Sequence, residues 1–248
     1  MKSHCKVAIV GGGIMGVSLL YHLTKEGWND IVLVEKGELT SGSTWHAAGQ
    51  CPHFVGSYNS AKIHNYSNKL YQELEKETGQ STGWHGCGSI RLALKQEDVD
   101  WFHYVKGILD NVGSPAEFIS KDKILELHPF LKIDDVLCGL YTPEDGYTDP
   151  TSTTNAMAIA ARKAGAEIYR HNRVLEINQL ASGEWELSTE KGNIVSEHVV
   201  NAAGSFGIEV GAMVGLSNIP SVNMIHHYLV TENHPKIKNR EKELPVVR

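Results

Sequence analysis

Strand-like and helix-like hydrophobic patterns alternate at the start of this 248-residue chain. Lys6–Val10 is a short apolar run rich in β-branched residues, which is typical of a buried strand. A glycine-rich turn and a helical pattern to about Glu26 follow it, and Ile31–Val34 is a second apolar run. The period changes from strand to helix to strand within roughly 30 residues, as a parallel crossover requires. The pattern therefore predicts a βαβ unit.

The rest of the chain is predicted as a mixture of helices and strands. Helical spacing over about 60–78 places Ile63, Leu70 and Leu74 on one face. Further helices are predicted at about 97–111, 121–127, 149–164 and from Phe206. Strands are predicted at 89–94, 137–141, 166–170, 173–178, 184–189, 197–201 and 222–231. Residues 36–58 are expected to form a loop, and 232–248 a polar tail without a closing element.

These elements indicate an α/β fold: a Rossmann-like nucleotide-binding domain with an inserted β-rich substrate region. The βαβ start needs further strands to complete its sheet, whereas the chain stops at a strand and a charged tail. We therefore expect the N-terminal part of a longer polypeptide.

A glycine pattern opens the first predicted helix. Gly11, Gly13 and Gly16 fit G-x-G-x-x-G, which permits a tight turn, close approach of pyrophosphate to the backbone, and close helix–strand packing. The helix N-terminus then offers N–H groups and partial positive charge to phosphate. Glu35 follows the second strand, where its carboxylate can accept hydrogen bonds from ribose hydroxyls. A carboxylate at this position disfavours the 2′-phosphate of NADP. The alternative is a purely structural glycine turn.

The later pattern favours FAD over NAD. An NAD enzyme would usually continue with regular βα repeats, whereas here a long loop, helices and a separate β-rich region at 166–200 follow. The strand end Asn201-Ala202-Ala203-Gly204 brings small residues that allow a second close backbone approach to a dinucleotide. An ordinary strand-to-helix turn is the alternative.

The loop Gly42–Gly49 displays a histidine among small residues soon after the nucleotide site. The neutral imidazole of His46 is a nucleophile, and its small neighbours leave room for the edge of a flavin ring. His46 is therefore the candidate for a covalent bond to FAD. A surface polar residue is the ordinary alternative.

Several motifs together resemble the dimethylglycine and sarcosine dehydrogenases, within the D-amino-acid-oxidase-like flavoproteins. The motifs are V-A-I-V-G-G-G-I-M-G at 7–16, V-E-K at 34–36, E-L-T-S-G-S-T-W-H-A-A-G at 38–49, G-S-I-R-L-A at 88–93, G-L-Y at 139–141, D-P at 149–150 and V-N-A-A-G at 200–204. The resemblance runs over nearly the whole chain, and the histidine loop is its most specific part.

The resemblance implies a role for each matching position. His46 corresponds to the histidine that bonds the flavin 8α-methyl carbon. The remaining cofactor-binding positions that it implies, or that the glycine pattern gives, are Gly11, Gly13, Ile14, Met15, Gly16, Glu35, Lys36, Gly42, Ser43, Thr44, Trp45, Ala47, Ala48, Gly49, Gln50, Val174, Gly204 and Phe206. Phe206 stands where relatives often have tryptophan. One FAD-dependent oxidoreductase domain would cover 1–248, with FAD-binding parts at about 1–90 and 145–215 and substrate-side parts at about 91–144 and 216–248.

Candidate substrate residues lie on the last predicted strand. Met224, His226 and Tyr228 alternate and would share one face. The His-x-Tyr segment resembles one that lies near the substrate in the family; His226 would help keep the amine neutral, and Tyr228 would orient it. Ordinary strand packing is the alternative. Arg91 offers a guanidinium fork for a glycine-type carboxylate, or is simply an exposed strand arginine.

The expected function is FAD-dependent dehydrogenation or oxidation of an N-methylated glycine by hydride transfer to the flavin. Its partners would be a small-molecule amine and an electron acceptor, either a flavoprotein or oxygen. The alternatives are a related flavin oxidase of another amine or amino acid, and a non-catalytic regulatory relative.

Composition and charge exclude several other classes of protein. The net charge of −6 argues against a nucleic-acid surface, and no apolar run is long enough for a bilayer. The four cysteines are widely spaced, so reduced and mostly buried thiols are expected, and no metal site. The first strand begins almost at Met1, which favours a cytoplasmic protein.

Overall fold

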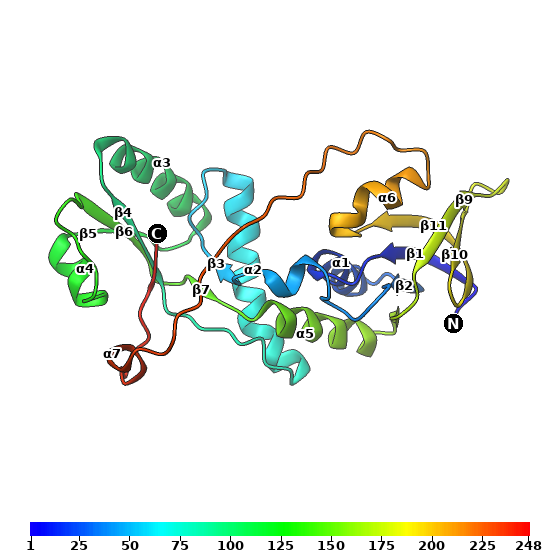
Figure 1. The fold of residues 1–248 in the computed structure, drawn as a ribbon, viewed down its shortest axis with the longest axis horizontal. Helices are drawn as coiled ribbons and strands as arrows, with labels where there is room; N and C mark the ends of the chain where they lie inside the picture. Colours follow the sequence, from blue (N-terminus) through cyan, green and yellow to red (C-terminus); the bar gives the residue numbers. More distant parts are fainter. The chain divides into compact units, whose positions relative to one another are not determined.

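A computed structural model describes residues 1–248, and their contacts form two compact units (Figure 1). The first unit comprises Met1–Ala48, Leu74–Thr82 and Pro150–His226. The second unit comprises Gly49–Glu73, Gly83–Asp149 and His227–Arg248. The expected division of the chain into FAD-binding and substrate-side parts stays a prediction.

A six-stranded sheet organises the first unit. Its strand order is β8-β2-β1-β11-β10-β9, in which β8, β2, β1 and β11 run parallel and β10 and β9 antiparallel. Its strands are β1 (His4–Val10), β2 (Ile31–Val34), β8 (Glu167–Tyr169), β9 (Val174–Gln179), β10 (Trp185–Thr189) and β11 (Gly192–Asn201). The apolar β-branched residues of β1 and β2 are buried, as strands in the middle of a parallel sheet require.

Three helices lie wholly within this unit. They are α1 (Ile14–Lys25), α5 (Pro150–Lys163) and α6 (Gly207–Ala212), with short 3₁₀ turns at η1 (Ser43–His46) and η2 (Gly204–Phe206). Helix α1 packs against α5, whose buried face carries small residues such as Ala156 and Ala161 that permit close approach.

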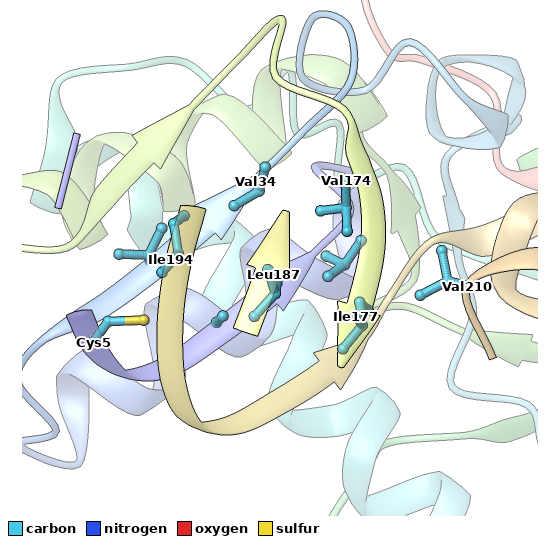
Figure 2. Close-up of a cluster of buried hydrophobic side chains, with 10 residues drawn as sticks. Cys5, Val34, Val174, Ile177, Leu187, Ile194 and Val210 are labelled. Carbon is cyan, nitrogen blue, oxygen red and sulfur yellow. The ribbon is translucent and has the colours of Figure 1, made fainter. Parts of the chain in front are cut away.

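The core of the first unit lies on the sheet and is drawn in Figure 2. Side chains from β1, β2, β9, β10, β11 and α6 meet there: Cys5, Val34, Val174, Ile177, Leu187, Ile194 and Val210. Strands far apart in the sequence therefore share one apolar cluster, which stabilises the order of the sheet.

The second unit has its own small sheets. One has the order β12-β4-β6-β5, and β3 pairs with β7 in another. The strands are β3 (Gln50–Cys51), β4 (Ser89–Ala93), β5 (Glu117–Ile119), β6 (Cys138–Thr142), β7 (Gly146–Tyr147) and β12 (Val246–Val247). The helices are α3 (Gln96–Val112), α4 (Lys121–Leu127) and α7 (Pro235–Lys238), and α2 (Tyr58–Thr78) contributes residues to both units.

Four sequence-based predictions were wrong. The β-rich region at 166–200 is not separate, because β8 and β11 extend the sheet of β1 and β2 on its two sides. Residues 222–231 form no strand, since no other strand of the chain pairs with them, and Met224 is 89% exposed. The tail does contain ordered elements, α7 and β12. Ile63 is exposed on α2, whereas Leu74 is buried.

None of the helices has the combination of length and apolar composition that spanning a bilayer requires.

Candidate functional site

The glycine turn between β1 and α1 is a place of very close backbone approach. Gly11 has a φ of +119°, and a Cβ there would lie 2.3 Å from the carbonyl oxygen of Ala202. A Cβ on Gly16 would lie 2.0 Å from the carbonyl oxygen of Gly11. Only glycine fits at both positions, so α1 starts directly against the carboxyl ends of β1 and β11.

The N-terminus of α1 has a polar environment suited to an anion. Gly13 is the N-cap and supplies no side-chain cap, and the first turn carries no acidic side chain. The N–H of Ile14 donates to Oγ1 of buried Thr44 at 3.0 Å, while the neighbouring Met15 is 74% exposed. A helix start of this kind favours phosphate through its N–H groups and dipole.

Glu35 is tied to the glycine turn. Its Oε2 accepts the N–H of Gly12 at 2.6 Å, and its Oε1 accepts the N–H of Gly37 at 2.7 Å. The side chain is buried at the end of β2. Each oxygen can still accept a second hydrogen bond, so binding of the ribose hydroxyls remains a prediction. The two observed hydrogen bonds join the carboxylate to the backbone of the glycine turn.

Replacing Glu35 by glutamine is expected to lower the free energy of unfolding by about 1–3 kcal/mol. The amide nitrogen cannot accept, so one of the two backbone N–H groups, the buried one of Gly12 or the partly buried one of Gly37, loses its partner. Urea unfolding of the two proteins measures the difference. An unchanged midpoint would show that neither bond matters, and Glu186→Gln, at a partly exposed position of β10, serves as the matched control.

Two other predicted cofactor residues contact each other in the first unit. Nζ of Lys36 lies 3.0 Å from the ring centroid of Phe206, a cation–π contact. Nearby in sequence, Oγ of Ser43 lies 3.4 Å from Oγ of Ser205. The residues after β2 and those after β11 therefore lie side by side at the carboxyl ends of the two strands.

His46 lies at the end of η1 and its side chain is exposed. Its ring centroid is 3.7 Å from that of Trp45, with the ring planes 33° apart. Two residues earlier, Thr44 holds Ile14, so the loop is anchored to the glycine turn. The imidazole is therefore presented to solvent from a loop fixed beside the candidate phosphate site.

The other predicted residues are distributed differently. Ala47 and Ala48 complete the loop in the first unit, whereas Gly49 and Gln50 belong to the second. Val174 begins β9, two residues after Asn172, whose N–H donates to the carbonyl of Glu35 at 2.9 Å. Gly204 starts η2 with a φ of +56°.

The two candidate substrate residues fall in a segment without regular structure. His226 and Tyr228 do not lie on a strand, so the shared face predicted for them is wrong, because the segment lacks a pairing partner. Tyr228 is 60% exposed. Their roles toward a substrate stay predictions.

Two contacts at the turn were missed by the sequence analysis. A Cβ on Gly12 would lie 2.7 Å from Cδ2 of Leu39 and 2.9 Å from Cβ of Glu35, so this position of the turn is crowded as well. Thr40 has a φ of +68°, and its N–H donates to the carbonyl of Gly12 at 3.0 Å. The third glycine was a visible signal, whereas nothing in the sequence marks Thr40.

The four cysteines are free thiols, as expected. Burial, followed by the charge of Asp145, raises the pKa of Cys51 to about 12. Because the thiolate is the reactive form, Cys51 should resist iodoacetamide in the native protein at pH 8 and react after unfolding. Peptide mass spectrometry measures this, and rapid native labelling of Cys51 would contradict it.

Comparison with known proteins identifies the family of this chain. A family model described as FAD dependent oxidoreductase matches residues 6–247. Dimethylglycine dehydrogenase, mitochondrial, of Rattus norvegicus is 45% identical over 247 residues, which is 100% of this chain and 29% of that protein. The resemblance found in the sequence is thereby confirmed, and this chain spans less than a third of that relative's length.

Two further proteins match this chain, one a regulatory subunit and one an enzyme of known structure. The mitochondrial regulatory subunit of pyruvate dehydrogenase phosphatase of Mus musculus is 40% identical, covering 93% of this chain and 26% of that protein. The crystal structure of L-proline dehydrogenase from P. horikoshii superposes with a TM-score of 0.81 at 26% identity, covering 88% of this chain and 58% of that one. The predicted α/β flavoprotein fold class is confirmed.

Proposed function

This chain belongs to the FAD dependent oxidoreductase family, and on that premise we propose that it serves the oxidation of an N-methylated glycine of the dimethylglycine or sarcosine type. The observation that carries the proposal is the glycine turn, which only glycine can form and which meets the anchored histidine loop. The 45% identity to a dimethylglycine dehydrogenase supports the choice of substrate.

The residues present fit FAD. The close approach at Gly11 and Gly16 leaves backbone rather than side chain at the start of α1, where a pyrophosphate needs N–H donors. Glu35, Lys36 and Phe206 would hold the adenosine end, and the loop Gly42–Gln50 would lie along the flavin. Bound FAD supplies a hydride acceptor for oxidation of a carbon–nitrogen bond.

The chain's own side chains would then do three things. His46 would hold the cofactor covalently through its imidazole, which prevents loss of the flavin. His226 would accept a proton from the substrate ammonium, because only a neutral amine has the lone pair that favours hydride loss. Tyr228 would orient the amine nitrogen or the substrate carboxylate by hydrogen bonding.

The proposed substrate is tested by anaerobic titration of the purified full-length protein. N,N-Dimethylglycine or sarcosine is expected to bleach the flavin absorbance, and His226→Gln to shift the pH profile of that reduction. Unrelated amines serve as the control. Bleaching by another amine or amino acid, with none by the methylated glycines, would instead support the alternative of a related flavin oxidase.

A second candidate function comes from the match to the phosphatase regulatory subunit. In this alternative the chain keeps the fold but does no redox chemistry. The exposed histidine loop, which Thr44 anchors beside the start of α1, argues for a working cofactor site. Flavin that stays oxidised with every amine tested would favour the regulatory function.

Two further parts of the proposal are the electron acceptor and the cellular location of the protein. The electron acceptor would be a flavoprotein or oxygen, which stopped-flow reoxidation with and without oxygen distinguishes. The cytoplasmic location expected from the sequence stays a prediction, and the matched dimethylglycine dehydrogenase is named as mitochondrial. Cell fractionation decides between the two compartments.

A further inference from the structure

The indole of Trp45 lies against the imidazole of His46. The two ring centroids are 3.7 Å apart, and the ring planes are tilted by 33°. Trp45 is 56% exposed, and the imidazole is exposed as well. The contact therefore gives a large apolar side chain little burial, and its main consequence is a restriction on the orientation of the imidazole.

The backbone that carries the two rings is tied to the glycine turn. The N–H of Trp45 donates to the carbonyl of Thr40 at 3.4 Å, and the N–H of Thr40 donates to the carbonyl of Gly12 at 3.0 Å. Between them in the sequence, Thr44 accepts the N–H of Ile14 at 3.0 Å. The indole therefore stands on a backbone that hydrogen bonds connect to the start of α1 at two points.

Trp45 is the single large apolar side chain of the loop Gly42–Gly49. The other residues of the loop besides His46 are glycine, alanine, serine and threonine. The threonine, Thr44, is buried, and its hydroxyl is engaged by Ile14. Within the loop, the indole is therefore the side chain that has both the size and the position to orient the imidazole.

Orientation matters for a nucleophile on an exposed loop. The side-chain torsions of a histidine sample several arrangements, and only some of them point a ring nitrogen at one particular carbon atom. Holding the reacting groups in the productive geometry beforehand raises the rate of the step. The attraction within an aromatic pair corresponds to a preference of roughly two- to tenfold for the stacked orientation.

We propose that Trp45 is a positioning residue for the covalent attachment of FAD, because its indole holds the His46 imidazole in the orientation that reaches the flavin 8α-methyl carbon. The proposal rests on the proposed function, which it deepens by naming the residue that prepares the histidine for its bond. Trp45 acts through His46 and accepts no proton, because the indole N–H is a donor only.

The bond-forming step balances with molecular oxygen as the oxidant. The lone pair of one imidazole nitrogen forms the new carbon–nitrogen bond. One C–H bond of the methyl group and the N–H bond of the imidazole break, which releases two protons and leaves two electrons on the flavin ring system. Molecular oxygen takes up these two electrons and two protons as hydrogen peroxide.

The test measures how fast the full-length apoprotein, prepared from riboflavin-starved cells, binds FAD covalently. Acid-stable flavin and intact mass are followed in air at saturating FAD, so that a change in FAD affinity does not alter the rate. Trp45→Leu is expected to slow bond formation about tenfold, the upper end for the loss of an aromatic pair. Trp45→Phe keeps a ring that can stack and should stay within about twofold of the wild-type rate.

The matched control is Trp101→Leu, in the other unit. Trp101 is 47% exposed and stacks on Tyr104 with the ring centroids 5.1 Å apart. Its replacement should leave the rate of covalent attachment unchanged. A thermal melt identifies any variant that fails to fold, and Trp45→Gln, which also removes the ring, carries the test if Trp45→Leu does not fold.

The outcomes separate this proposal from the proposed function. A Trp45→Leu rate equal to that of wild type, or a Trp45→Phe rate as low as that of Trp45→Leu, would overturn the positioning role. Wild-type protein that forms no acid-stable flavin would overturn it together with the bond at His46. No amine substrate enters the experiment, so flavin that methylated glycines fail to bleach would overturn the proposed oxidation and leave the role of Trp45 standing.

Discussion

Replacing His46 by alanine is expected to release FAD completely from the denatured chain. Wild-type protein precipitated with acid should stay yellow, and its intact mass should exceed that of the polypeptide by one FAD. The variant should leave its colour in the supernatant. The physical reason is that the exposed imidazole is the basic nucleophile of the loop Gly42–Gln50, which Thr44 anchors at the glycine turn.

The control for this variant is His4→Ala, which removes another exposed histidine of the first unit. It should leave the bound mass unchanged. Flavin retained by the denatured His46→Ala protein would assign the bond to a different residue. Flavin lost from denatured wild type would show that the cofactor is held without a covalent bond.

Replacing Gly16 by alanine is expected to destabilise the protein by about 3 kcal/mol or more. The new Cβ would lie 2.0 Å from the carbonyl oxygen of Gly11 and 3.3 Å from Cβ of Ala202. Backbone cannot yield as the end of a flexible side chain can, so α1 would have to move away from β1 and β11. Loss of the flavin absorbance should accompany the loss of stability.

The matched control is Gly107→Ala, in the interior of α3. No atom lies within 4 Å of the Cβ that it would add, and its φ is not positive. Alanine there should be neutral or raise stability by about 0.5–1 kcal/mol, since it restricts the unfolded chain and favours helix. Urea unfolding measures both variants. A Gly16→Ala protein as stable as wild type would contradict the packing at the turn.

Local pattern was sufficient to predict the elements that form the site. The strand of Val7–Val10, the helix after Gly13 and the acid at Glu35 each follow from short-range rules, and the structure has all of them. The contact between Ile14 and Thr44 did not follow, because it depends on how a loop 30 residues later folds back.

The pairing of strands that are distant in the sequence could not be predicted from the sequence. The run at 222–231 has the alternation of a strand, yet a strand needs a partner, and none is present in this chain. The two-residue strands β7 and β12 carry no periodic signal, since they are too short to show one. Arg91 was ambiguous for the same reason: its burial depends on Phe54 and on β12, which are remote in the sequence.

The most direct test of the account is the absorbance spectrum of the purified full-length protein, with the flavin counted against polypeptide. The account predicts flavin bands and one FAD per chain. A colourless protein that also fails to take up added FAD would contradict the cofactor site at the glycine turn, on which the proposed oxidation depends.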